Sequence, residues 1–337
     1  MVRAKGVARV ILTLLLGISA LVVVAKYVLS IDIRSALGRV AMVPIEVLAL
    51  ALLARSVGPV LHSTQFYLLL RSCGYGMSFK KTVLVVYSTL ALEYVVPVGG
   101  VTEVGRVALL VREGVPPDGA VLVTFLHRLA HSLFTALELA LVLLLVRRVD
   151  GLTLWLIVVT SAVNAINLAA LTSARSPRVS RLLDRAVSKL GFKSPNPRSF
   201  TYPGLNSLAA VLAVIGLEKL SMVFSGHLVL SRLASSIGLP QSFLLFDILL
   251  ATFWLLPIVT PAGVGQVESV QLMASTAMNV DSTAALSAFI LYRLVTLAAV
   301  LPQLLVALAK YGLSIVLGTQ SLGKPACAES LRCGGLP

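Results

Sequence analysis

Residues 97–112 read PVGGVTEVGRVALLVR and residues 261–275 read PAGVGQVESVQLMAS, and these two stretches decide the fold. Each opens with proline and glycine and then runs apolar for about 11 or 12 residues. Because an α-helix rises about 1.5 Å per residue, such a helix reaches only about 18 Å, whereas the bilayer core is about 30 Å thick. Each stretch is therefore expected to form an interfacial helix or a re-entrant hairpin.

The two stretches are copies of one pattern, separated by 165 residues. Three chemically distinctive positions match at this offset: Gly100 with Gly265, Glu103 with Glu268, and Arg128 with Arg293. Matching Leu and Val carry little weight in an apolar chain, but charged residues within membrane spans are rare. The offset therefore predicts two related halves.

The composition points to a membrane protein. In 337 residues, 58% are hydrophobic and 12% are charged, and the mean hydropathy is +0.95. These values exclude a soluble globular protein and a disordered one. The net charge of +14 favours contact with anionic lipid over nucleic acid. Three cysteines provide neither a disulfide scaffold nor a zinc ligand set.

Several apolar stretches are long enough to cross a bilayer. We place them at roughly 9–31, 40–70, 82–97, 119–147, 152–172, 205–231, 240–260 and 282–316. The first is interpreted as a retained anchor and not as a signal peptide. The second contains Pro44 and Pro59, so it is expected to be tilted or broken. The sequence thus predicts an all-α, polytopic integral membrane protein with two inverted helical repeats and short re-entrant helices.

Four regions follow from this pattern. They are an N-terminal membrane half (1–172) with a re-entrant helix near 97–112, a basic segment (173–203), a C-terminal membrane half (204–316) with a re-entrant helix near 261–275, and a polar tail (317–337). The basic segment carries seven Lys and Arg residues against a single acid, Asp184. It is either a cytoplasmic loop or an amphipathic helix on an anionic leaflet.

Charge also predicts the topology. If the N-terminus is cytoplasmic and each Gly-Glu element returns to the face it came from, most cations face inward: Arg71, Lys80, Lys81, Arg106, Arg112, Lys310 and the basic segment. The outer loops keep only Arg34, Arg39, Arg147, Arg148 and Arg232. Each half then crosses the membrane an odd number of times, so the halves are inverted, as in many transporters.

Several ionisable residues lie within apolar segments: Glu46, Glu93, Glu103, Glu138, Glu218, Asp247, Glu268, Arg55, Arg128, Lys219 and Arg293. Each costs on the order of 3 kcal/mol in lipid unless it lines a cavity or has a partner. Together they indicate a polar interior. The alternative is a set of structural ion pairs between helices.

The repeated elements suit an anion site. A helix that begins within the membrane directs free N–H groups and the positive end of its dipole toward the centre. Arginine adds a fork that fits phosphate oxygens. The candidate substrate-binding residues are Gly99, Gly100, Glu103, Arg128, Gly263, Gly265, Glu268 and Arg293. In the alternative interpretation, the glycines permit turns and the arginines only neutralise Glu103 and Glu268.

His127 and His131 are four residues apart on one expected helix, a spacing found in metal sites, with Glu138 further along the same face. The sequence offers no HExxH pattern, and it identifies no definite third ligand. Lining of a polar cavity is therefore preferred to a metal site. No cofactor is expected either, because no P-loop or dinucleotide motif is legible.

The chain resembles the lysylphosphatidylglycerol synthase transmembrane family. The resemblance rests on PVGGVTEVGRVALLVREGV followed by the Arg128 helix, and on LPIVTPAGVGQVESVQLM followed by YRLVTLAAVLPQLL. In the second copy, Ala262 replaces one glycine of the family's Pro-Gly-Gly-x-Gly-x-x-Glu element. The segment from Phe66 to Lys81 is similar to the family's first cytoplasmic turn.

This resemblance implies a flippase that moves a phosphate-bearing anionic lipid, either a phospholipid or a polyprenyl-linked sugar, between leaflets of the cell membrane. The soluble aminoacyltransferase domain of two-part members is expected to be absent, so the chain is interpreted as a transporter and not as an enzyme. The alternatives are a membrane-embedded enzyme and an accessory subunit of glycolipid synthesis. The expected partner is anionic lipid and not nucleic acid, and homo-oligomerisation stays open.

Overall fold

The computed structural model describes residues 12, 15–95, 101–145, 151, 158, 161–162, 165, 203–234, 237–249 and 263–316. Throughout these ranges the ordered elements are helices, and no strand occurs in them. The basic segment (its residues 173–202), the polar tail, Gly99 and Gly100 lie outside the described residues.

Among the described residues, four helices are long and apolar enough to cross a membrane: α3 (Ile45–Ser72), α6 (Pro117–Leu145), α9 (Leu205–Leu233) and α13 (Ser282–Val316). A fifth candidate is a bent pair, Leu15–Val28 and α2 (Ile33–Val40), whose parts meet at 114°. The π-helical turn η1 (Val24–Val28) ends the first of these. The all-α, polytopic membrane fold is thus confirmed.

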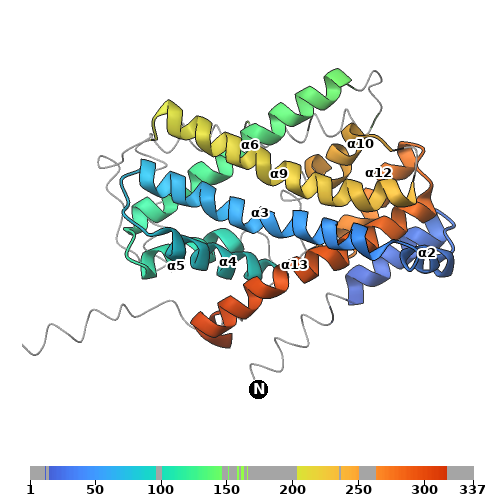
Figure 1. The fold of residues 1–337 in the computed structure, drawn as a ribbon, viewed down its shortest axis with the longest axis horizontal. Coiled ribbons are helices and arrows are strands. Elements are labelled where there is room, and N and C mark those ends of the chain that lie inside the picture. The colour runs from blue at the N-terminus through green and yellow to red at the C-terminus, as the bar shows by residue number, and fades with distance from the viewer. Residues whose placement is uncertain are drawn as a thin grey trace, which may run out of the picture.

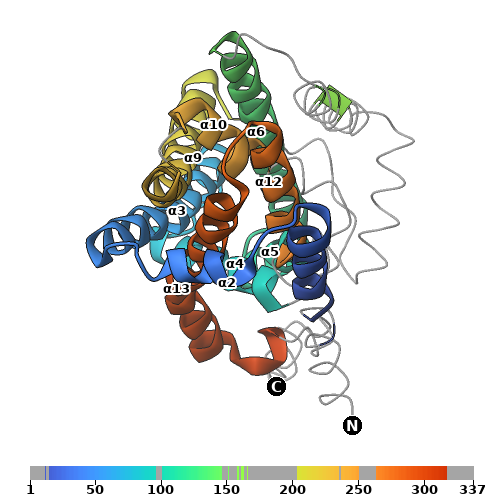
Figure 2. The same cartoon turned by 90° about the vertical axis from the view of Figure 1, so that its right-hand side faces the viewer.

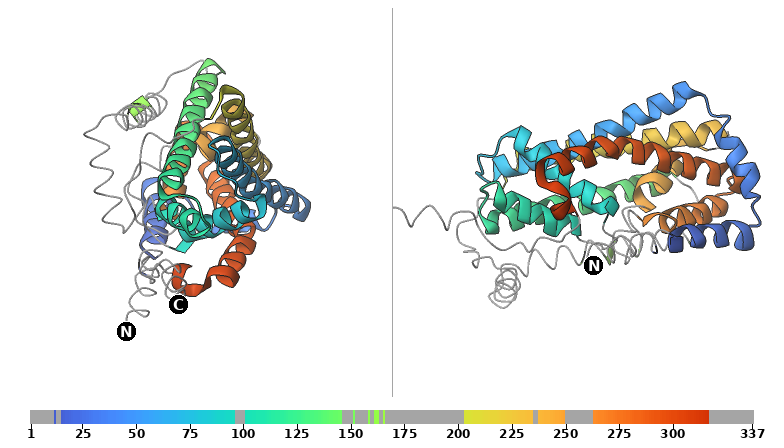
Figure 3. Two further views of the ribbon diagram at one scale, coloured as in Figure 1. Left: turned by 90° about the vertical axis from the view of Figure 1, so that its left-hand side faces the viewer. Right: turned by 90° about the horizontal axis from the view of Figure 1, so that it is seen from below.

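The long helices run roughly along one axis and form a bundle (Figures 1 and 3). α3 lies along α9, and the two are adjacent when the bundle is seen end-on (Figure 2). α13 packs against α2, α3, α9, the shorter helix α4 (Phe79–Val95) and α12 (Gln266–Ala277). Because α13 contacts helices from both halves, it joins them into one unit.

The segment 40–70, expected to be tilted or broken, is interrupted before Pro44 but is not broken at Pro59, and its tilt stays a prediction. Helix α3 is continuous from Ile45 to Ser72, with Pro44 at its N-cap and Pro59 inside it. Proline at the start of a helix costs nothing, because the first N–H groups have no intrahelical partner. Pro59 removes one interior hydrogen bond, but it is buried and α3 is held along its length by α9. Tertiary packing therefore outweighs the helix-breaking tendency of this proline.

The repeat is visible in local structure. Helix α5 (Val101–Arg112) and helix α12 have the same length, and their bounds differ by the 165-residue offset. Each ends in a turn with a left-handed residue, Gly114 at φ 97° and Asn279 at φ 60°. These turns close with matching hydrogen bonds, from Val115 N–H to the Leu110 carbonyl and from Val280 N–H to the Ser275 carbonyl. Both are helix C-caps of the left-handed type.

The two turns lie at opposite ends of the bundle (Figure 1). Lys310, late in α13, approaches Glu113 in the α5–α6 turn at 3.3 Å. Asp281, just before α13 begins, pairs with Arg39 of α2 at 2.7 Å. Helices α6 and α13 therefore leave their turns in opposite directions. The inverted two-fold relation of the complete halves remains a prediction.

Two of the cations expected on the cytoplasmic side, Lys81 and Lys310, lie together at one end of the bundle. Lys81 lies 3.3 Å from Glu113, in the same cluster as Lys310, whereas Arg39 lies at the other end. Arg106 is the exception. It is 3% exposed, and its Nε donates to Thr89 Oγ1 at 3.2 Å, so it is an interior residue and not a loop charge. A basic residue on a short helix cannot be assigned to a loop from sequence alone.

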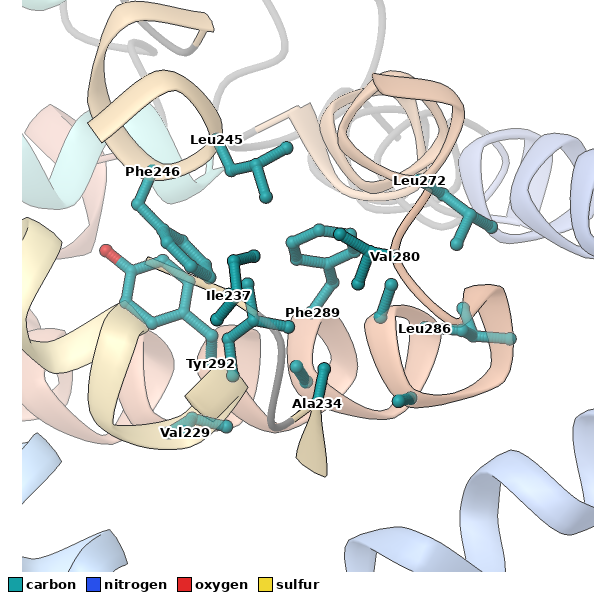
Figure 4. Packing of buried hydrophobic residues seen from close by; sticks show 14 of the residues in the cluster. Val229, Ala234, Ile237, Leu245, Phe246, Leu272, Val280, Leu286, Phe289 and Tyr292 are labelled. Carbon is teal, nitrogen blue, oxygen red and sulfur yellow. The ribbon is translucent and has the colours of Figure 1, made fainter. Parts of the chain in front are cut away.

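The apolar core of the second half is built from rings and aliphatic side chains. The short helix α10 (Leu239–Phe243) is followed by the π-helical turn η3 (Leu244–Ile248), which contains Phe246. The ring of Phe246 packs edge-on against those of Tyr292 and Phe289 of α13 (Figure 4). Leu272 of α12 lies across the same cluster. This packing fixes the position of α12 against α13, and with it the candidate site described below.

Cysteines at the matched ends of α5 and α12 should react from opposite sides of the membrane. Arg112 and Ala277 are both exposed and are 165 residues apart. Single variants Arg112→Cys and Ala277→Cys, made after replacing the three native cysteines, can be treated with an impermeant maleimide on sealed vesicles. Labelling of both from the same side would contradict the inverted arrangement.

The α5–α6 turn should weaken in acid. Burial raises the pKa of Glu113, but hydrogen bonds from Lys310 and Lys81 outweigh it, so the pKa lies below its ordinary value of 4.5. Because the pKa is lower in the folded than in the unfolded protein, the ion pairs stabilise the fold fully above pH 4.5. This stabilisation is lost as the pH falls through the pKa of the folded protein. Glu113→Gln should therefore lower the free energy of unfolding at pH 7 by less than about 1 kcal/mol, and this deficit should shrink as the pH falls below 4.5. An equal deficit at both pH values would contradict this.

Candidate functional site

Glu268 joins the start of α12 to α13. Its Oε2 accepts a hydrogen bond from Gly265 N–H at 2.6 Å, which caps the helix, and its Oε1 accepts from Arg293. The Glu268 side chain is 5% exposed and that of Arg293 is 17% exposed. The pair is therefore shielded from solvent, where an ionic hydrogen bond is stronger than in water.

The first copy contains the equivalent pair in a more open setting. Arg128 Nη1 donates to Glu103 Oε1 at 2.6 Å, and the two side chains are 37% and 27% exposed. The other oxygen of Glu103 is buried and has no hydrogen-bond partner among the residues that the structure describes. Both Glu–Arg pairs predicted from the repeat are thus present. Whether they also bind substrate remains a prediction.

The glycines of the second copy are required by their surroundings. Gly265 has φ 82°, and a Cβ built on it would overlap the backbone carbonyl of Gly17 in the first helix. Gly263 has φ 68°, and a Cβ there would lie 2.7 Å from Val267 Cγ2. The glycine loop is therefore packed against the N-terminal helix, and at these two positions only glycine fits without strain.

Gly265→Ala should destabilise the protein by about 2–3 kcal/mol, because left-handed strain and a backbone overlap add together. Gly74→Ala is the matched control, since Gly74 has φ 85° and nothing lies within 4 Å of its Cβ position. It should lose only about 1 kcal/mol. Thermal unfolding in detergent compares the two variants. Equal losses would show that the contact with Gly17 does not matter.

A second charged cluster lies deeper in the bundle. Lys219 of α9 donates to both Asp247 oxygens, at 2.6 and 2.8 Å, and to Thr135 Oγ1 at 3.1 Å. Glu138 Oε2 lies 3.1 Å from the same nitrogen. All three ionisable side chains are at most 7% exposed. Two acidic side chains thus share one buried ammonium group, which joins α6, α9 and η3.

A third polar cluster lies beside it on α3, α6 and α9. Glu218 accepts from Gln65 Nε2 at 2.6 Å and lies 2.9 Å from His62 Nδ1. Gln65 Oε1 in turn lies 2.8 Å from the Nε2 atoms of His127 and of His131. The adjacent residues Glu218 and Lys219 thus serve different clusters from neighbouring faces of α9.

These clusters form a stripe along α6. Polar residues occur at the helical spacing of one face and are wholly or partly buried: Thr124, His127, Arg128, His131, Thr135 and Glu138. The sequence marked most of these residues but could not show their partners. His62 and Gln65 were missed, because a single polar residue in an apolar helix gives no signal of what faces it.

These features define a class, the polytopic α-helical membrane proteins that keep ionisable groups inside the helical bundle. A family model described as the lysylphosphatidylglycerol synthase TM region matches residues 10–302. Since the match covers most of the chain, the protein belongs to this family, a membrane region related to lipid synthesis or flipping. No curated protein matches the chain significantly.

Proposed function

We propose that the protein is a flippase that moves an anionic, phosphate-bearing lipid between leaflets, with its two halves in inverted orientation. The lipid would be a phospholipid or a polyprenyl-phosphate-linked sugar. Family membership supports the lipid class, and the interior charges support a polar pathway. We further propose that the protein lies in the cell membrane with its N-terminus in the cytoplasm, because the cations at the Lys81 end fit the cytoplasmic side.

The repeated Glu–Arg pair is the single observation that carries this proposal. Each arginine pairs with a glutamate of a short helix that the sequence predicts to begin within the membrane, one in each copy. A phosphate can replace the carboxylate as the partner of the guanidinium, because both anions accept the same two-pronged hydrogen bond. The displaced glutamate then either keeps a structural role or takes up a proton.

The polar stripe of α6 is the proposed pathway for the lipid headgroup. It leads from the Glu103–Arg128 pair past the histidines to Lys219 and Asp247. Asp247 lies in η3, whose backbone carbonyl at Leu245 accepts from Gln271 of α12. We propose that the helices separate along this stripe during transport, so that its polar side chains replace water around the headgroup.

The alternative functions are a membrane-embedded enzyme and an accessory subunit, and one assay separates them. Purified protein is reconstituted in vesicles with fluorescent phosphatidylglycerol, and dithionite quenches the label that is exposed outside. A flippase quenches more label than protein-free vesicles do, and mass spectrometry recovers the lipid unchanged. Phosphatidylcholine, which has no net charge, serves as the control lipid. A mass shift supports the enzyme, and quenching equal to that of protein-free vesicles refutes the flippase for this lipid.

A further inference from the structure

Three of the four histidines of the chain meet inside the bundle. His62 comes from α3, and His127 and His131 come from consecutive turns of α6. One ring nitrogen of each lies within 4.8 Å of the others. The ring centroids of His62 and His127 are 4.6 Å apart, and those of His127 and His131 are 4.5 Å apart. The sequence did not identify a third candidate ligand beside His127 and His131, and in the structure this candidate is His62 of α3.

The ring nitrogens of the three histidines lie close together and differ in their hydrogen-bond partners. His62 contacts Glu218 Oε1 through Nδ1, while its Nε2 is buried and has no hydrogen-bond partner in the described part of the chain. The Nε2 atoms of His127 and His131 converge on one oxygen, Gln65 Oε1, at 2.8 Å each. Three imidazole nitrogens, one of them without a hydrogen-bond partner in the described part of the chain, and the Gln65 amide oxygen are thus gathered at one place, where they supply four candidate metal ligands.

The donor set fits a particular class of ion. Three imidazoles with an amide or carboxylate oxygen suit first-row divalent metals such as zinc, and His at i and i+4 on a helix is a frequent part of such sites. A carboxylate that holds the other nitrogen of a ligand histidine, as Glu218 does for His62, is the usual supporting contact. Phe66, whose ring lies 4.0 Å from that of His127, covers the cluster on one side.

Two of the three cations near the histidines are paired with carboxylates. Lys219, next to Glu218 in the chain, is already paired with Asp247 and Glu138. Arg128 is paired with Glu103, and Arg106 lies over the Phe66 ring at 4.3 Å. The Glu218 carboxylate therefore remains as the anion nearest to the histidines.

We propose that His62, His127 and His131 form a binding site for a divalent transition metal ion, with Gln65 or Glu218 supplying an oxygen ligand. The ion fastens α3 to α6 in the middle of the polar stripe. This inference does not depend on lipid transport, because it concerns metal content alone.

Metal content tests the proposal. The full chain is purified with an affinity tag that contains no histidine, stripped with a chelator, incubated with Zn²⁺ and desalted. Wild-type protein should retain about one zinc ion per chain, and Co²⁺ should give the absorption bands of a four- or five-coordinate site. His127→Gln/His131→Gln should lose the ion. His227→Gln is the matched control, since His227 contacts Ser242 Oγ outside the cluster, and it should retain the ion.

Binding to the single variant His62→Gln should be at least about tenfold weaker, which gives a second test if the double variant does not fold. Zinc should also raise the melting temperature of wild-type and His227→Gln protein but not that of His62→Gln. Absence of retained zinc in wild-type protein, or equal retention in the cluster variants and in His227→Gln, would overturn the proposal.

Discussion

Lys219→Met is expected to lower the free energy of unfolding by about 3–5 kcal/mol, the typical effect of removing one partner from a buried ion pair. Lys219 is 4% exposed, and its nitrogen contacts both oxygens of Asp247 as well as Glu138. Methionine fills a similar volume, so the loss arises from the charge and not from a cavity. Asp247 and Glu138 are then left together in the interior without their cationic partner.

Thermal unfolding in detergent measures this loss, and a matched lysine serves as the control. Lys310 pairs with Glu113 at the end of the bundle, where its side chain is 34% exposed. Lys310→Met should therefore lose less than about 1 kcal/mol. Neutralising the carboxylates as well, in Lys219→Met/Asp247→Asn/Glu138→Gln, should recover most of the stability. If Lys219→Met is no worse than Lys310→Met, the cluster is not a buried ionic centre.

Arg293→Lys is expected to reduce lipid transport about tenfold or more while the protein still folds. Lysine keeps the positive charge and can still neutralise Glu268, but it loses the planar fork that binds two phosphate oxygens. Arg39→Lys is the control, since Arg39 pairs with Asp281 at the surface and its side chain is 37% exposed. That variant should transport at the wild-type rate.

The double variant Glu268→Gln/Arg293→Gln separates the two roles of the pair. A purely structural ion pair can be replaced by two neutral side chains with little loss of function. A phosphate-binding arginine cannot be replaced in this way, so we expect the double variant to fold but to transport poorly. Transport at the wild-type rate would show that the pair only holds α12 to α13.

Much of the architecture was predictable because membrane helices are encoded by length and hydropathy. The helices at 117–145, 205–233 and 282–316 agree closely with the apolar stretches. The Glu–Arg pairs were predictable because a repeated pattern of rare charges restricts the partners. In each copy the two members are 25 residues apart, and they pair within that copy.

Other features depended on contacts that one sequence does not show. Continuity of α3 through Pro59 depends on its packing with α9. Arg106 can lie in the interior because it donates a hydrogen bond to Thr89 and packs over the Phe66 ring. The histidine cluster required His62, which is 65 residues from His127 and has no local pattern to mark it. Long-range partners of single polar residues are set by tertiary packing, which periodicity cannot reveal.

The central claim is that the repeated arginines bind the lipid phosphate, and a density map tests it most directly. The protein would be imaged in nanodiscs that contain phosphatidylglycerol. Our account predicts phosphate density within hydrogen-bond distance of the guanidinium of Arg128 or Arg293, with the acyl chains reaching the bilayer. Density for lipid only on the outer surface of the bundle, with both arginines held by Glu103 and Glu268 alone, would contradict it.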